Sequence, residues 1–314
     1  MILNYDSPDD TLEALDSVMR SAYTDQHVVV VDNNTSGDAR AALRSHLPPM
    51  VSYLTPGQNI GYAAGNNLGI EYLVERGVDH VCVLNPDARV MFRTIGDLVA
   101  AATVHKDAGI VGPRLVHGGS NPATVQSDGG LVDWSRAGAT VHVNGGARLD
   151  SLKGGVAEVD YVTGACALFS RRMIEDVGTI PEDYFLYYEE TDYALRAKKA
   201  GWACVVDRDI KALHYRRSTG SVPSRAYVYY MTRNRAVFAR RHLTETGAVE
   251  RAYADLDATF LNPWRDRIGE RIPPLTEVFD LVVKIAKEHG ERGRTGRYVD
   301  LNNYQVEGIA GWES

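Results

Sequence analysis

Three carboxylates lie within four residues in the second half of the chain, beside several aromatic side chains. They are Glu189, Glu190 and Asp192, and the run Phe185-Leu186-Tyr187-Tyr188 precedes them. Like charges beside apolar rings are unfavourable, because desolvation and mutual repulsion both disfavour an ionised carboxylate. Proteins often keep such clusters where a proton or a metal ion is handled. The cluster is therefore the first candidate for a catalytic site.

Polar residues also follow three short apolar runs, at Asn4, at Asp32-Asn33-Asn34 and at Asn85-Pro86-Asp87. In open parallel sheets, ligands bind beyond the carboxyl ends of the strands, so we expect these residues to share one crevice. Asp87 follows a proline that fixes the backbone, and a rigid carboxylate suits a hard cation such as Mg²⁺ or Mn²⁺. For this tripeptide taken alone, a simple turn is the favoured interpretation.

The segment 59–67 combines Gly61 and Gly65 with several asparagines. Glycines allow close backbone approach, and a following helix N-terminus favours phosphate. The segment has neither the dinucleotide-binding glycine spacing nor a P-loop lysine. A structural turn between a strand and a helix explains its glycines equally well.

These residues sit between alternating strand and helix patterns. Strands are predicted at 2–5, 28–31, 51–54, 80–84, 109–111, 161–169 and 202–206, and helices at 8–19, 39–43, 68–73, 94–103, 171–177 and 191–201. Repeated strand–helix units imply a mostly parallel sheet with helices on both faces. The glycine-rich residues 112–160 predict loops and short antiparallel strands, a wall or lid over a site. From Tyr227 onward the pattern is helical and basic.

Composition excludes several classes of protein. The 314 residues carry a net charge of -7, and phosphate-backbone binding needs a basic surface, so nucleic acid is not an expected partner. Cys82, Cys166 and Cys204 are odd in number and widely spaced, which predicts reduced thiols and no zinc site. No apolar run approaches the ~20 residues that span a bilayer, and the N-terminus enters a strand pattern at once without a signal peptide. We therefore expect a cytoplasmic protein.

Taken in order, these segments closely resemble the family 2 glycosyltransferases of GT-A fold, most of all the rhamnosyltransferase-type branch. The segments that carry the resemblance are Leu3-Asn4-Tyr5, Val30-Val31-Asp32-Asn33-Asn34, Asn59-Ile60-Gly61-Tyr62 with Gly65-Asn66-Asn67, Leu84-Asn85-Pro86-Asp87, Val162-Thr163-Gly164-Ala165 and Phe185 through Arg196. They cover roughly the first three quarters of the chain. The residues beyond Leu243 carry little of the resemblance.

The resemblance implies an α/β, Rossmann-like GT-A fold, with a mostly parallel central sheet flanked by helices and a helical C-terminal extension. It divides the chain into a nucleotide-sugar-binding half (1–112), an acceptor-binding and catalytic half (113–243) and the extension (244–314). The C-terminal helices are a candidate surface for peripheral contact with the inner face of the membrane or for a homodimer.

The resemblance also assigns the donor site. Asp32 would bind the nucleobase or ribose of a nucleoside-diphosphate sugar. Nucleotide-sugar-binding candidates are Leu3, Asn4, Tyr5, Asp32, Asn34, Asn59, Gly61, Asn66, Asn85 and Gly164. Asn85-Pro86-Asp87 resembles the family's Asp-x-Asp metal motif with its first acid replaced, which leaves Asp87 as the main carboxylate ligand for Mg²⁺ or Mn²⁺. His214 matches the family's late histidine, which completes metal and diphosphate coordination; a strand-end histidine bonded to the backbone is the alternative.

In this family the second acid of the cluster usually accepts the proton of the acceptor hydroxyl. That position is Glu190 here, with Glu189 as the alternative base and Asp192 as the third catalytic candidate. A charged helix start, favoured by the helix dipole, is the competing interpretation of all three. Arg233-Asn234-Arg235 resembles a basic tract of the same branch, which would contact diphosphate or an anionic acceptor, or form a solvated helix face.

The expected activity is inverting, metal-assisted transfer of a single sugar, with rhamnose a candidate, from a dTDP- or UDP-sugar to a hydroxyl of a glycan, glycolipid or natural product. A nucleotide-sugar-binding protein without turnover and a nucleotidyltransferase are the alternatives. A nucleotidyltransferase would be expected to carry a basic phosphate-gripping segment near the N-terminus, and none follows Leu3-Asn4-Tyr5 in this chain. A processive polymerase is disfavoured, because no Gln-x-x-Arg-Trp segment follows the acidic cluster.

Overall fold

The computed structural model describes residues 1–33, 37–215, 222–309 and 312. Packing divides the chain into two compact units. Unit 1 contains Met1–Leu131, Val141–Glu182 and Glu189–Arg216, and unit 2 contains Val132–Thr140, Asp183–Tyr188 and Arg217–Ser314. By packing, helix α7 (Arg225–His242) groups with the helices that follow it. The functional division at 112 and 243 stays a prediction.

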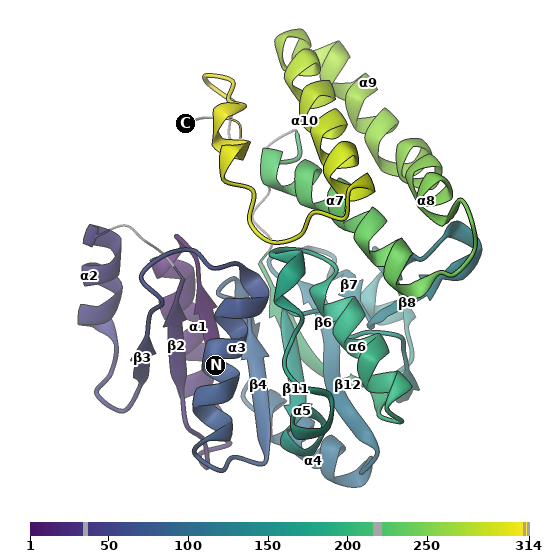
Figure 1. The fold of residues 1–314 in the computed structure, drawn as a ribbon. Helices are drawn as coiled ribbons and strands as arrows, with labels where there is room; N and C mark the ends of the chain where they lie inside the picture. Colours follow the sequence, from purple (N-terminus) through teal and green to yellow (C-terminus); the bar gives the residue numbers. More distant parts are fainter. Residues whose placement is uncertain (34–36, 216–221, 310–311, 313–314) are drawn as a thin grey trace. The chain divides into compact units, whose positions relative to one another are not determined.

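The first half of the unit 1 sheet is parallel, as the strand–helix alternation predicts (Figure 1). Its order is β3 (Ser52–Leu54), β2 (Val29–Asp32), β1 (Ile2–Asn4) and β4 (His80–Leu84). The helices α1 (Pro8–Met19), α2 (Gly37–His46) and α3 (Tyr62–Val74) connect these strands. Because β1 runs parallel to both β2 and β4, the polar residues after these three strands lie at one edge of the sheet.

The second half of the sheet is mixed. Strand β11 (Cys166–Ser170) is antiparallel to both β4 and β6 (Ala108–His117), and β12 (Ala203–His214) is parallel to β6. Three short antiparallel strands complete the sheet: β5 (Ala88–Val90), β7 (Val125–Ser127) and β10 (Val156–Glu158). Strands β8 (Gly130–Asp133) and β9 (Ala139–His142) pair separately. The expected short antiparallel strands within 112–160 are thus present.

Several predicted boundaries are wrong. The strands predicted at 109–111 and 202–206 continue to His117 and His214, because β6 and β12 stay paired across a register shift near Asp207. The strand predicted at 161–169 begins only at Cys166, and β5 was not predicted. Helix α3 begins at Tyr62, inside the predicted glycine-rich loop, and α6 (Glu189–Lys199) begins at Glu189.

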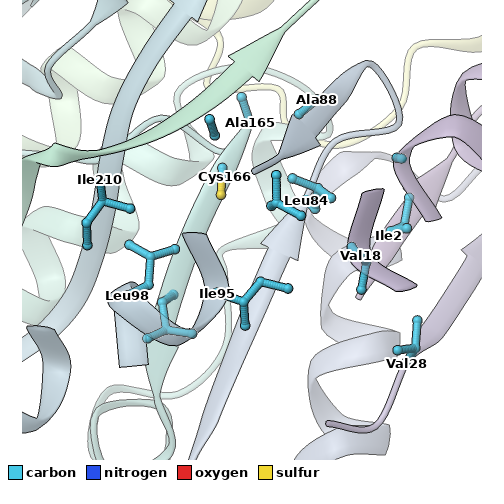
Figure 2. Close-up of a cluster of buried hydrophobic side chains, with 14 of the residues drawn as sticks. Ile2, Val18, Val28, Leu84, Ala88, Ile95, Leu98, Ala165, Cys166 and Ile210 are labelled. Atoms are coloured by element: carbon cyan, nitrogen blue, oxygen red, sulfur yellow. The ribbon is translucent and has the colours of Figure 1, made fainter. Parts of the chain in front are cut away.

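The unit 1 core lies between the sheet and two helices, α1 and α4 (Thr94–Val104), as Figure 2 shows for ten labelled side chains. Helices α3, α5 (Arg171–Val177) and α6 lie on the other face of the sheet (Figure 1). Helix α3 packs closely there because Gly65 and Gly69 have no side chain. A Cβ atom at Gly65 would lie 2.7 Å from Leu3 Cδ1.

Unit 2 is mainly helical, as expected for the C-terminal extension. It contains α7, α8 (Ala248–Leu256), a π-helical segment (Asp257–Leu261), α9 (Asn262–Arg271) and α10 (Pro273–Glu291). Short 3₁₀ turns occur in the chain at Trp134–Arg136, Leu149–Ser151, Glu182–Tyr184 and Val299–Asn303. Within unit 2, Tyr229, Phe279 and Trp312 are buried in the apolar cluster between the helices. Among the described residues, the helices are too short or too polar to cross a membrane.

Candidate active site at the edge of the unit 1 sheet

Asp87 and His214, the two predicted metal ligands, are in contact. His214 Nε2 lies 3.0 Å from Asp87 Oδ1. Strand β12 delivers His214, and its antiparallel partner β5 begins directly after Asp87, with His214 opposite Ala88. The backbone N–H of Tyr215 donates to the Asp87 carbonyl at 2.7 Å, which fixes this end of the pairing. The predicted long-range juxtaposition is therefore present.

The second ring nitrogen of His214 lies 2.7 Å from Gln126 Oε1. An amide oxygen only accepts hydrogen bonds, so this contact is a hydrogen bond when Nδ1 carries a proton, and Nε2 then faces Asp87. Gln126 is not among the residues predicted from the sequence, because it lies in a segment without clear periodicity. No group of three or more candidate metal-ligating side chains occurs in the described part of the chain. Asp87 and His214 thus form a two-residue donor set.

Asn4 and Asp32 form a buried polar pair where β1 and β2 end. Asn4 Nδ2 donates to Asp32 Oδ1 at 2.8 Å, and Tyr53 Oη donates to Asp32 Oδ2 at 2.6 Å. Arg40 Nε lies 3.7 Å from the same carboxylate. Burial of the carboxylate is offset by these partners. Tyr53 and Arg40 were not predicted from the sequence. Tyr53 lies within strand β3 and Arg40 within helix α2, and neither belongs to a recognisable motif.

Asn33 joins the end of β2 to the glycine-containing turn before α3. Its Nδ2 donates to Gly61 O at 2.9 Å and to Asn59 Oδ1 at 3.2 Å, while Ile60 N donates to its Oδ1 at 2.9 Å. Gly61 has a φ of +95°, a conformation that side chains rarely adopt. Asn59 and Gly61 therefore shape the turn, and their nucleotide contact stays a prediction. Asn34 lies outside the described residues.

Tyr62 links the Asn85-Pro86-Asp87 turn to the loop before β11. Its Oη lies 3.2 Å from Asn85 Oδ1 and 2.9 Å from Gly164 O. A Cβ atom at Gly164 would lie 2.2 Å from Tyr62 Oη, so this close approach requires glycine. Tyr62, Gly164 and Glu190 also line one internal cavity of about 10 Å³, close to what one water molecule needs. From the sequence, Tyr62 was noted only as the last residue of the Asn59-Ile60-Gly61-Tyr62 motif, without a role of its own.

Glu189 and Glu190 start helix α6 as a buried, hydrogen-bonded pair. Glu189 is 2% exposed, whereas Glu190 keeps partial exposure. Burial raises the pKa of the Glu189 carboxyl well above its usual range, and the Glu190 charge raises it further. Burial also raises the pKa of Glu190, although its hydrogen bond with Glu189 opposes that change. These directions favour protonation of Glu189 before Glu190, and the role of either residue as the base stays a prediction.

The third acid of the cluster is placed differently. Asp192 is fully buried and forms an ion pair with Arg196 one turn later in α6, at 3.1 Å. This pairing matches the competing interpretation, a charged helix start. A guanidinium partner favours the ionised form of a carboxylate, and a catalytic role for Asp192 stays a prediction.

Three other donor-site candidates differ in exposure. Leu3 is a core residue whose side chain packs under α3 at Gly65. Tyr5 is exposed at the edge of the sheet. Asn66 is buried inside α3, where its Nδ2 donates to Tyr62 O, and its Oδ1 has no hydrogen-bond partner among the described residues. Only Tyr5 presents a side chain freely at the surface.

Of the two interpretations of Arg233-Asn234-Arg235, the solvated helix face is wrong, whereas contact with diphosphate or an anionic acceptor stays a prediction. All three side chains on α7 are at most 1% exposed, so they form no solvated face. Arg235 contacts Asp255 and the Arg136 carbonyl within unit 2. The sequence pattern signalled a basic helix, but burial depends on what packs over the helix.

The mixed central sheet with helices on both faces defines an α/β protein of GT-A type. Residues 1–178 match the model of glycosyl transferase family 2, so the chain belongs to this family. The match confirms the resemblance that the ordered motifs indicate.

Several curated relatives are named as sugar transferases. The chain is 30% identical over 202 residues to the low-salt glycan biosynthesis hexosyltransferase of Haloferax volcanii, covering 63% of this chain and 61% of that enzyme. It is 31% identical over 218 residues to the N-acetylglucosaminyl-diphospho-decaprenol L-rhamnosyltransferase of Mycobacterium tuberculosis, covering 63% and 69%. A dTDP-rhamnosyl transferase of Shigella flexneri is 26% identical, covering 60% and 59%. The matches thus span about two thirds or less of these relatives.

Solved structures confirm the GT-A fold. GalNAc-T7 with UDP, GalNAc and Mn²⁺ aligns with a TM-score of 0.58 at 12% identity, covering 87% of this chain and 57% of that one. A mannosyltransferase from Pyrobaculum calidifontis with GDP-Man and Mn²⁺ aligns with a TM-score of 0.53 at 15% identity, covering 92% and 85%.

Proposed function

We propose that this protein is an inverting glycosyltransferase that moves one sugar from a dTDP- or UDP-sugar to an acceptor hydroxyl. The observation that carries the proposal is the Tyr62 bridge in unit 1. Tyr62 contacts Asn85, two residues before Asp87, and lines the same cavity as Glu190. One side chain thereby connects the candidate proton acceptor, Glu190, with the turn that carries the candidate metal ligand, Asp87.

The donor set suits a divalent cation. Asp87 Oδ1 and His214 Nε2 converge at 3.0 Å, and oxygen and imidazole ligands suit Mn²⁺, while carboxylate oxygen also suits Mg²⁺. When bound, the metal supplies Lewis-acid stabilisation of the departing nucleoside diphosphate. Two protein ligands suffice where diphosphate oxygens provide others. The Mn²⁺ bound in the two structural neighbours supports this assignment.

Within this proposal, Glu190 accepts the proton from the acceptor hydroxyl. The hydroxyl oxygen forms the new bond at the anomeric carbon, the bond to the diphosphate breaks, and the proton passes to a Glu190 carboxylate oxygen. Protonated Glu189 donates its hydrogen bond to Glu190 and so keeps the second charge out of the pair. Asp32 and Tyr53, joined at 2.6 Å, are placed to contact the nucleoside.

The relatives narrow the substrates. Rhamnosyl transfer in two relatives, one of which is named for a dTDP-rhamnosyl donor, favours dTDP-rhamnose among the candidate donors. The decaprenyl diphosphate acceptor named for the mycobacterial relative favours a lipid-linked glycan, which this protein would meet at a membrane surface.

The test uses purified protein with dTDP-rhamnose, dTDP-glucose, UDP-galactose and UDP-N-acetylglucosamine in the presence of Mn²⁺ or Mg²⁺. Release of nucleoside diphosphate is measured with and without a lipid-linked N-acetylglucosamine acceptor. The proposal expects slow hydrolysis of one donor alone and faster release with acceptor. Nucleotide-sugar binding by calorimetry without any release would favour the binding protein, and pyrophosphate release from a nucleoside triphosphate and a sugar phosphate would favour a nucleotidyltransferase.

A further inference from the structure

Helix α7 holds the backbone that leads into the acidic cluster. The Asn234 side chain is fully buried in unit 2. Its amide nitrogen contacts three carbonyl oxygens, those of Tyr184 at 3.1 Å, Leu186 at 2.7 Å and Tyr187 at 2.9 Å. The two N–H groups of one amide are therefore shared among three backbone acceptors, and an apolar residue at 234 would remove the donor that faces Leu186 O and Tyr187 O.

Arg233 orients this amide and adds to the same contact. Its Nε donates to Asn234 Oδ1 at 2.8 Å, so the Asn234 amide nitrogen is the end that faces the carbonyls. A second guanidinium nitrogen donates to Tyr184 O at 2.6 Å, and the third donates to Gly296 O. Each of the three guanidinium nitrogens therefore binds a protein oxygen, which uses three of the five N–H donors of Arg233 within unit 2.

The segment that these two residues hold has an unusual conformation. Phe185, Tyr187 and Tyr188 have φ angles of 68°, 69° and 76°. Bulky residues rarely adopt left-handed backbone conformations, which persist only where surrounding contacts fix them. Glu189 follows directly, as the first residue of α6. Strain of this kind is often found at functional sites.

We propose that Arg233 and Asn234 are positioning residues that hold the backbone of residues 184–188 in its left-handed conformation. They thereby set the residue at which α6 begins and the direction in which the Glu189 and Glu190 side chains project. The proposal rests on the proposed function, in which Glu190 accepts the proton. In this role the two buried side chains act through the backbone and not through contact with substrate. Their loss therefore affects the chemical step and leaves donor binding at the sheet edge intact.

The test compares wild type with Asn234→Ala and Arg233→Lys in sugar transfer and in hydrogen–deuterium exchange of peptides covering 184–192. We expect kcat to fall at least tenfold in both variants, with the donor KM within threefold of wild type, and exchange of these peptides to accelerate at least tenfold. Lysine keeps the charge but offers one nitrogen in place of a three-nitrogen fork. A purely electrostatic role would leave Arg233→Lys close to wild type.

Arg240→Gln is the matched control. Arg240 lies on the same helix and also donates to backbone carbonyls, but to those of Gly290 and Glu291. This variant should leave kcat and the exchange of 184–192 unchanged. If wild type transfers no sugar from any donor, the proposed function fails while the exchange comparison still decides the backbone role. Unchanged exchange in Asn234→Ala would overturn the positioning role, as would a kcat within twofold of wild type.

Discussion

His214 Nε2 lies 3.0 Å from Asp87 Oδ1, although 127 residues separate them in the chain. The contact depends on strand β12 running on to His214 and pairing there with β5. When Nδ1 carries a proton toward Gln126, the two facing atoms can share either a proton or a cation. Metal and nucleotide affinity should therefore respond together to changes in this pair.

Asp87→Asn should weaken Mn²⁺-dependent binding of UDP or dTDP at least tenfold. The variant keeps the size of the side chain and removes the charge that a divalent cation needs. Isothermal titration calorimetry with and without Mn²⁺ measures the effect. Binding in EDTA should be weak and equal for wild type and variant. Equal affinity in the presence of Mn²⁺ would rule out Asp87 as a ligand.

Gln126→Leu should lower Mn²⁺ affinity about 10–100-fold, the usual effect of losing a partner that orients a ligating histidine. The leucine cannot accept the His214 Nδ1 hydrogen bond, whereas Gln126→Glu still can. We expect the glutamate variant to bind Mn²⁺ at least as tightly as wild type. Titration of both variants checks this order. A leucine variant with wild-type affinity would show that Gln126 does not orient the histidine.

Glu190→Gln should reduce sugar transfer at least a thousandfold with donor affinity nearly unchanged, because the amide cannot accept the proton. Burial raises the pKa of Glu190, and a base acts only when ionised. Wild-type kcat should therefore rise with pH, with its acid limb above the ordinary range of a glutamate, about pH 4.3. Steady-state rates from pH 5 to 9 measure this limb. If Glu189→Gln abolishes transfer and Glu190→Gln does not, the two roles are reversed.

The same burial makes a separate prediction about stability. Glu189 has a raised pKa, so the folded state holds its proton more tightly than the unfolded state. Its stabilising contribution is complete below about pH 4.3 and is lost as pH rises through the folded-state pKa. Glu189→Gln has no ionisable group at this position, so it does not lose stability in this way as pH rises. We expect it to melt a few degrees higher than wild type at pH 8 and at nearly the same temperature near pH 4. A lower Tm at pH 8 would contradict the assignment.

The sequence predicted the parts of this site that follow from local patterns. Buried β-branched runs fixed β2 and β4, and their polar ends were correctly placed at one edge of the sheet. Asp87 and His214 were paired through the family resemblance, since nothing local to either residue specifies a partner 127 positions away.

The missed features depend on tertiary contacts. Gln126 and Tyr62 act through partners on distant elements, Gly164 among them, so their own neighbours in sequence give no signal. Asn234 and Arg233 looked like an exposed basic tract, because helical periodicity identifies a face without showing what covers it. The left-handed backbone of Phe185, Tyr187 and Tyr188 could likewise not be predicted, because these residue types locally prefer negative φ angles and contacts with distant residues hold the segment.

Gly164→Ala gives the sharpest test of the Tyr62 bridge. Its Cβ would lie 2.2 Å from Tyr62 Oη but 3.1 Å from Tyr62 Cζ, so the clash is mainly with the hydroxyl. We expect Gly164→Ala to lower kcat/KM for the donor at least tenfold, and Tyr62→Phe alone to lower it less, because that variant loses the one hydroxyl that lies within hydrogen-bond distance of Asn85 Oδ1 and Gly164 O. The double variant should be more active than Gly164→Ala, because removing the hydroxyl relieves the clash. Gly37→Ala, where the added Cβ meets nothing within 4 Å, should match wild type. Strictly additive losses in the double variant would mean that residues 62 and 164 act independently, and the bridge between Asn85 and the Glu190 cavity would lose its functional role.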